Sequence, residues 1–151
     1  MMKKVLIMFL LVVMVFSFTG CSSKPTSTVC SITNTIGKDD VTLDYDKDGK
    51  ITKYTSIYVV DVTGLGYEDD YYTAMAEAYK QALEEKNGFS YDYKIENSTV
   101  TETLVMDASV GSVEDGLWLN ILPTGTTAET LTKDGLTKLL TDKGYACTEK
   151  K

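Results

Sequence analysis

Residues 41–63 read VTLDYDKDGKITKYTSIYVVDVT and contain two runs of alternating apolar and polar side chains. The first run has apolar residues at positions 41, 43 and 45, and the second, residues 51–63, is apolar on both faces in its later half. A period of two predicts half-buried strands, and the intervening Asp48-Gly49 pair is a strong hairpin signal. We therefore predict a hairpin whose second strand lies centrally in a sheet.

The segments on either side of this hairpin extend the pattern. Residues 29–36 predict a first strand, followed by a turn at residues 38–40. After the hairpin the spacing becomes helical over residues 67–86, and Gly88 is placed to end that helix. The residues that the spacing places inward on it are Tyr72, Met75, Tyr79 and Leu83.

The C-terminal half predicts a second hairpin and a second helix. Residues 89–95 alternate cleanly, and apolar residues return at positions 100, 104 and 106. Residues 110–127 are irregular, and Thr130 is placed to cap a helix over residues 131–143 with Leu136, Leu139 and Leu140 inward. Residues 145–147 would return to the sheet. The fold class is therefore α+β: an antiparallel sheet of about five or six strands built from hairpins, with two helices packed on one face.

Composition excludes several kinds of site. The chain has 151 residues and a formal net charge of −7, and its fifteen cations are all lysine because it contains neither histidine nor arginine. Without histidine there is no Ser-His or Cys-His nucleophile pair and no histidine metal site. Without arginine there is no bidentate phosphate fork, and the acidic balance argues against nucleic acid as a partner. The length suits one domain.

The first residues resemble an export signal. Lys3 and Lys4 precede an apolar run over residues 5–16, and Thr19-Gly20-Cys21 follows. Thr-Gly-Cys after such a run resembles the bacterial lipobox, with Phe18 where leucine is commonest. The resemblance implies a lipoprotein signal peptide over residues 1–20 and a lipid such as palmitate on Cys21. We expect a cell-membrane location facing outside the cytoplasm, with the bilayer as a partner through acylated Cys21.

The remaining sequence divides into two parts under this interpretation. Residues 21–28 are polar and rich in serine and threonine, which predicts a flexible tether, and residues 29–151 form the single domain. Cys30 and Cys147 lie near the two ends of that domain. An even pair in an exported chain favours a structural disulfide, with free buried thiols or a redox site as the alternatives.

At this point the chain resembles the YehR-like bacterial lipoproteins, a family of unknown function. The resemblance rests on Cys21, on Val29-Cys30, on the charged hairpin of residues 45–53, on Thr101-Glu102-Thr103 followed by Asp107, and on the ending over residues 143–147. It implies a small lipid-anchored α+β domain with paired terminal cysteines. It implies no activity, and no catalytic residues are carried over.

Two local patterns suggest ligands, each with a simpler alternative. Asp44, Asp46 and Asp48 with Gly49 resemble the start of an EF-hand calcium loop, but position twelve is Thr55 instead of glutamate, so a charged hairpin tip is the alternative. A second pattern is aromatic. The tyrosines that would form either a ligand groove or the core are Tyr54, Tyr58, Tyr72, Tyr79, Tyr91 and Tyr93.

The irregular segment holds a further candidate. Leu117, Trp118 and Leu119 form an apolar island that would contact a partner if exposed, or cover the sheet if buried. We expect a non-catalytic binding or envelope-accessory domain, with no catalytic residues and no cofactor, whose partner is an envelope protein or a small ligand. The alternatives are a calcium-binding lipoprotein and an enzyme that uses carboxylates or tyrosine.

Overall fold

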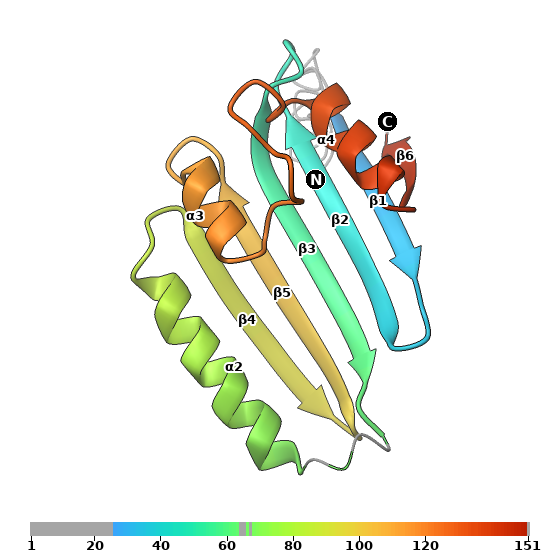
Figure 1. Ribbon diagram of the computed structural model, residues 1–151, viewed down its shortest axis with the longest axis vertical. Coiled ribbons are helices and arrows are strands. Elements are labelled where there is room, and N and C mark those ends of the chain that lie inside the picture. The colour runs from blue at the N-terminus through green and yellow to red at the C-terminus, as the bar shows by residue number, and fades with distance from the viewer. Residues whose placement is uncertain (1–25, 64–65, 67, 151) are drawn as a thin grey trace, which may run out of the picture.

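The computed structural model describes residues 26–63, 66 and 68–150, which form six strands and three helices. The elements are β1 (Thr26–Thr33), β2 (Gly37–Tyr45), β3 (Ile51–Asp61), α2 (Asp69–Glu84), β4 (Phe89–Glu96), β5 (Thr99–Asp107), α3 (Val113–Trp118), α4 (Lys133–Asp142) and β6 (Ala146–Lys150). All strands pair antiparallel in the order β4-β5-β3-β2-β1-β6 (Figure 1). The predicted α+β class is confirmed, and β3 is interior as expected.

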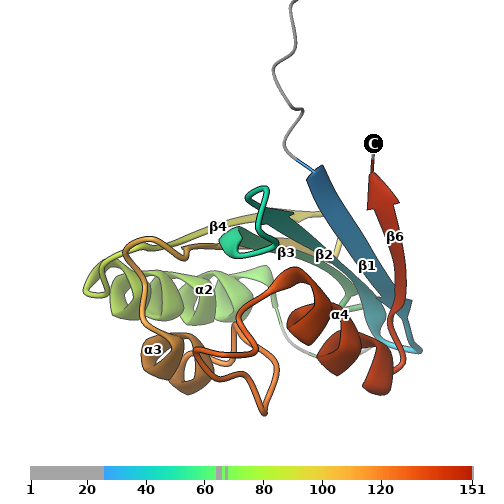
Figure 2. The same cartoon turned by 90° about the horizontal axis from the view of Figure 1, so that it is seen from above.

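One face of the sheet carries the core. Cross-strand partners share a face, and one row of partners runs through Leu43, Tyr54, Met106 and Phe89. These four side chains are buried, with exposures of 0%, 3%, 0% and 8%. All three helices lie over this same face (Figure 2). The fold is therefore two layers, a sheet and a helix layer, with the apolar core between them.

Local signals explain where the helices begin. Asp69 and Asp70 stand in the first turn of α2, where carboxylates interact favourably with the helix dipole. The short helix α3 is capped by Ser112, whose hydroxyl accepts a hydrogen bond from the Asp115 backbone N–H at 3.0 Å. Thr132 caps α4 in the same way through the Gly135 N–H at 3.2 Å.

Two tight turns set the strand register. Asn97 and Ser98 join β4 to β5, and both have positive φ, 49° and 59°. Two such residues match the twist of a two-residue hairpin. The turn between β1 and β2 is held by the Asn34 side chain, which accepts the backbone N–H groups of Ile36 and Gly37 at 2.9 and 3.0 Å. Asparagine commonly makes this kind of turn.

The structure corrects two assignments near the start of the domain. The first strand begins at Thr26 instead of Val29, so residues 26–28, which the sequence assigns to a tether, belong to β1. The predicted turn at residues 38–40 is wrong, because these residues pair with β1 and β3 inside β2. The carboxylates of Asp39 and Asp40 look like turn residues in sequence. They are accommodated in the strand because hydroxyl groups of neighbouring strands donate to them.

Two details of the helices were also predicted wrongly. Met75 is 54% exposed, whereas Ala76 takes the inward position on α2. The cap of α4 is Thr132 instead of Thr130, whose hydroxyl accepts from the Thr127 N–H at 2.7 Å within the preceding loop. The irregular pattern of residues 110–127 does not predict α3, so the described helix layer has three members instead of two. No described helix is long and apolar enough to cross a membrane.

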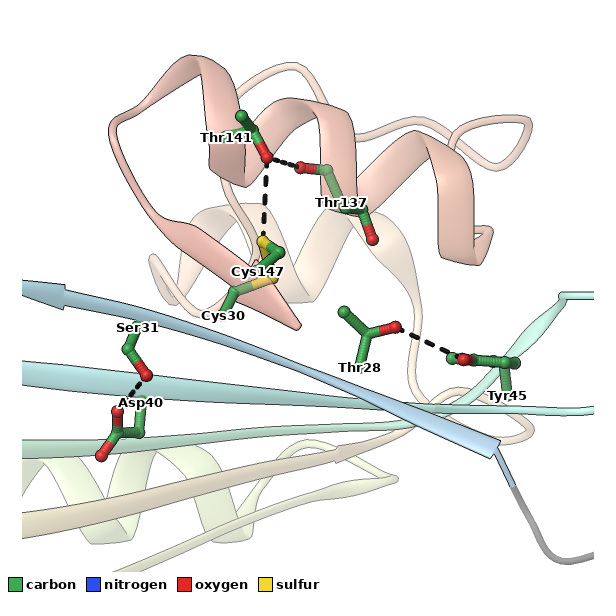
Figure 3. The surroundings of a disulfide bond; sticks show 8 residues. All are labelled: Thr28, Cys30, Ser31, Asp40, Tyr45, Thr137, Thr141 and Cys147. Atoms are coloured by element: carbon green, nitrogen blue, oxygen red, sulfur yellow. Dashed lines mark hydrogen bonds between the residues drawn. A yellow bond between two sulfur atoms is a disulfide. The ribbon is translucent and has the colours of Figure 1, made fainter. Parts of the chain in front are cut away.

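A disulfide joins Cys30 to Cys147 at the β1–β6 edge of the sheet, as the cysteine pair predicts (Figure 3). The two residues are direct cross-strand partners on β1 and β6, with their Cα atoms 3.9 Å apart. Cys30 is fully buried in the core, and the Thr141 hydroxyl of α4 lies 3.8 Å from the Cys147 sulfur. The bond therefore ties the short edge strand and the end of α4 to the first strand.

We predict that the double variant Cys30→Ala/Cys147→Ala unfolds more easily than the wild type by about 2–5 kcal/mol, because the bond closes a loop across almost the whole domain. The sequence separation is 117 residues. Urea denaturation followed by circular dichroism measures the change.

The control for this experiment is a reductant. It should lower the denaturation midpoint of the wild type and leave that of the double variant unchanged. A wild-type midpoint that does not respond to reductant would contradict a stabilising disulfide.

Candidate functional site

An open groove of about 700 Å³ runs between α2 and the sheet. Its floor is formed by Val60 of β3 and by Val100 and Leu104 of β5. One wall is the flank of α2, and the end of α3 closes it at Leu119 and Asn120. The α2 residues that line the wall are Tyr72, Met75, Ala76, Ala78, Tyr79 and Ala82. Apart from one carboxylate and a few polar atoms, the lining is apolar.

The groove arises from where the helices lie on the sheet. α2 packs against β4 at one side, and α4 packs against β1 and β6 at the other. The segment after α3 covers one end of the intervening strands, because Ile121 and Leu122 are buried in the core. The other end of β3 and β5 has no helix over it (Figures 1 and 2).

The carboxylate in the groove belongs to Glu102. It accepts a hydrogen bond from the Tyr91 hydroxyl at 2.5 Å. Burial, and then this hydrogen bond, raise the pKa of Tyr91 well above its usual range, so the phenol stays protonated. Tyr79 donates in turn to the Leu119 carbonyl at 2.7 Å and links α2 to the end of α3. These contacts hold the groove wall in place.

A smaller polar cavity of about 260 Å³ adjoins the groove and shares Leu104 and Asn120 with it. At its centre the Asp39 carboxylate accepts hydrogen bonds from the hydroxyls of Ser56, at 2.8 Å, and Tyr145, at 2.6 Å. Asn120 has a φ of 56°, a left-handed conformation that asparagine tolerates. The groove thus has an apolar half under α2 and a polar end beside α4.

The tyrosines of the site stay protonated at neutral pH. Burial raises the pKa of Tyr54, Tyr79 and Tyr145, so none of these phenols is a ready nucleophile at neutral pH. Hydrogen bonds lower the pKa of several aspartates elsewhere in the described chain, whereas a general acid needs a raised one. The aspartates with lowered pKa are Asp40, Asp61, Asp107 and Asp115.

The predicted calcium residues do not converge. Asp44 lies in β2 and pairs with Lys53 of β3 at 3.4 Å. Asp46 uses its Oδ1 to accept the backbone N–H groups of Asp48 and Lys50, each at 2.9 Å, which closes the hairpin turn. Within the described residues no group of three cysteine or acidic side chains is arranged to hold a metal. The charged hairpin tip accounts for this motif.

The three residues of the predicted contact island differ in how far they are exposed. Leu119 is 4% exposed and Leu117 packs against the core, whereas Trp118 is 67% exposed. The Lys86 ammonium lies 5.6 Å from the centroid of the Trp118 ring and pairs with Asp115 at 2.6 Å. Of the three side chains, that of Trp118 is thus the one largely exposed on the surface, while Leu119 lines the groove. Cys21, the predicted lipid attachment site, lies outside the described residues.

The tyrosines are divided between the core and the lining of the groove. Tyr54 and Tyr91 are buried in the core at 3% and 6% exposure, while Tyr72 and Tyr79 line the groove. Sequence reasoning missed Glu102 and Asn120 as site residues, because their place in the groove depends on how far apart α2 and α4 lie. The alanines at positions 76, 78 and 82 were the available signal, since a surface helix with small residues on one flank leaves space beside it.

Comparisons with known proteins identify the fold. No family model matches the chain, and no curated protein matches it in sequence. The NMR structure of the E. coli YehR protein, a structural genomics target, is similar, with a TM-score of 0.71, 13% identity, and coverage of 85% of this chain and 94% of that chain. An NMR structure of a Streptococcus pneumoniae TIGR4 protein is also similar, with a TM-score of 0.58, 16% identity, and coverage of 87% and 90%.

At these identities the likeness shows the fold alone. The YehR-like fold expected from the sequence is therefore confirmed. Neither comparison carries an activity or a ligand to this chain.

The protonated tyrosines predict a loss of stability at high pH. The pKa values of Tyr54, Tyr91 and Tyr145 in the folded state lie above the unfolded value of about 10. The stability that these protonated tyrosines contribute is therefore fully present below about pH 10 and is lost as the pH rises through the folded pKa values. Urea denaturation across that range measures the fall. The variant Tyr145→Phe should show a shallower alkaline fall, and an identical fall would contradict this role of Tyr145.

Proposed function

We propose that this protein is a lipid-anchored bacterial lipoprotein, located outside the cytoplasm, that binds a ligand in the groove between α2 and the sheet and performs no catalysis. The observation that carries the proposal is the groove itself, an apolar depression of about 700 Å³ with a single carboxylate on its lining. Ligand sites are typically concave and mostly apolar, with a few polar groups that fix orientation. The groove meets this description.

The sequence supports the anchor. Lys3, Lys4, the apolar run of residues 5–16 and Cys21 match the order of a lipoprotein signal. A structural disulfide also suits an oxidising compartment outside the cytoplasm. Acylation at Cys21 would supply the membrane attachment, because each buried CH₂ contributes about 0.8 kcal/mol.

The anchor also orients the domain. Five residue steps separate Cys21 from Thr26, about 17 Å at full extension. Thr26 pairs with Tyr45, so the start of β1 and the β2–β3 turn lie at the same end of the sheet. Val60 and Val100 lie toward the opposite end, where β3 finishes and β5 begins. Under this proposal the groove faces away from the bilayer and is accessible to a ligand from outside.

Absence of catalysis is part of the proposal. The tyrosines near the groove keep their protons, and Glu102 and Asp39 already accept hydrogen bonds from them. This arrangement positions acceptors for a ligand and provides no activated nucleophile. No observation on the described residues favours the calcium alternative.

The proposed lipid anchor is tested by the intact mass of the protein extracted from the membranes of its own host. The wild type should lack residues 1–20 and carry diacylglyceryl on Cys21. Cys21→Ala should retain residues 1–20 and carry no lipid, because the modified cysteine is the residue at which processing occurs. Cys30→Ala/Cys147→Ala serves as the control and should still be lipidated. An unacylated wild type would contradict the anchor.

The groove predicts binding of the apolar dye Nile red. The protein for this test is residues 21–151 with Cys21→Ser, which keeps every described element without a lipid. Ala78→Trp should weaken dye binding about tenfold or more, since Ala78 is an exposed wall residue and the indole would fill the groove.

The matched control for this variant is Ala74→Trp. Ala74 is exposed on the same helix and is not part of the groove lining. This control should bind the dye as the wild type does. Equal binding by all three proteins would place the dye elsewhere and contradict the proposed site.

A further inference from the structure

We propose, on the basis of the binding function above, that the groove receives an amphipathic α-helix of a partner protein, with an apolar face on the groove and a lysine or arginine that pairs with Glu102. The groove would thus be the position of a missing helix in the helix layer. Spacing, hydrogen bonding and charge each support this occupant.

The spacing of the helix layer fits one more helix. Four strand-to-strand steps separate β4 from β1, the strands that α2 and α4 cover. At about 4.8 Å a step these two strands are about 19 Å apart. Packed helices lie about 8–10 Å apart, so two helices separated by about 19 Å leave the width of one helix between them.

The groove has a suitable length and wall. Its floor runs from Leu104 to Val100 along β5, about 13 Å, which corresponds to between two and three helical turns. Ala78 and Ala82 stand one turn apart on the α2 wall. Small side chains let a second helix approach closely, and Met75 on the same wall is exposed and adaptable.

Backbone hydrogen bonding favours a helix over an extended peptide. The floor strands β3 and β5 each pair with a neighbour on both sides, so the floor offers no free row of backbone groups to a bound strand. An extended segment placed in the groove would bury its own N–H and C=O groups without partners, which costs free energy for each group. A helix satisfies those groups internally.

The charge of the groove lining indicates which polar side chain the bound helix should carry. Among the residues that line the groove, Glu102 is the ionisable carboxylate and no lysine is present. Tyr91 donates to one oxygen of Glu102, and a carboxylate has about four acceptor sites, so a further donor can bind. A cation on the bound helix complements this charge and fixes the orientation of the helix.

Three fluorescein-labelled synthetic peptides test the inference with the unlipidated chain used for the dye experiment. Each has about 18 residues, which is long enough to form a helix. The first has a leucine and alanine face flanked by lysines. The second replaces the lysines with glutamates, and the third places a proline at the centre of the first. Fluorescence anisotropy measures binding, and displacement of Nile red shows whether the peptide occupies the groove.

We expect the lysine peptide to bind and to displace the dye, and the other two peptides to bind at least about tenfold more weakly. Ala78→Trp should abolish binding while Ala74→Trp should not. Glu102→Gln, which still accepts from Tyr91, should weaken the lysine peptide about fivefold or more through loss of one charged partner. Glu96→Gln is the matched control, because Glu96 is an exposed β4 residue that pairs with Lys94 outside the groove.

The remaining outcomes separate this inference from the function on which it rests. Dye binding that Ala78→Trp blocks, without displacement by any peptide, overturns the helix and leaves the groove as a small-molecule site. If the lysine peptide still binds the Ala78→Trp variant, its binding reflects general attraction to an acidic protein. That result also overturns the inference that the groove receives a helix. Equal binding of the lysine and glutamate peptides removes the role of Glu102. Absence of dye binding contradicts the proposed function itself.

Discussion

Strands β3 and β5 have hydrogen-bonded neighbours on both sides, and their register decides which residues face the helices. Because side chains alternate along a strand, a slip of one residue would move Tyr54 and Met106 from the core to the opposite face. The two turns with special backbone geometry, Asn34 before β2 and Asn97-Ser98 before β5, hold that register at the ends of the strands. The disulfide does the same at the β6 edge. The core, the helix layer and the groove all depend on this alignment.

Sheet width then determines where the groove lies. Six strands at about 4.8 Å present a face about 25 Å wide, whereas α2 and α4 each cover about 10 Å. The difference is partly filled by α3 and the segment after it, which place Leu119, Ile121 and Leu122 over one end of the central strands. No segment among the described residues covers the other end in this way. The apolar floor at Val60 and Val100 therefore remains accessible, and the groove follows from the architecture without any dedicated loop.

The parts of the fold that the sequence predicts are those set by local periodicity. The β2–β3 hairpin was predicted because residues 41–63 alternate around Asp48-Gly49, and the second hairpin for the same reason. Lys38, Asp39 and Asp40 were misassigned because the stabilising partners of these carboxylates, such as Ser56 and Tyr145, are distant in sequence. The helical spacing predicts a buried Met75. This prediction is wrong because spacing alone does not determine which side of the helix contacts the sheet. Glu102 and Asn120 were missed as groove residues for a related reason: their role depends on how far apart α2 and α4 lie.

The tyrosines on the core side of the sheet affect what the site accepts. Tyr91 and Tyr145 place their hydroxyls at the border of the core, and each donates to a carboxylate, Glu102 or Asp39. The Glu102 carboxylate shares the groove lining with phenols and no lysine, and it makes no ion pair with a described residue, whereas the cavity that contains Asp39 is also lined by Lys143. A carboxylate in this setting favours a cation that arrives with its own apolar surface, because the apolar contacts exclude water and the charge fixes the orientation. The same phenols, kept protonated by burial, make the region a poor place for nucleophilic chemistry. The apolar and the polar residues of the groove are therefore both consistent with the proposed binding function.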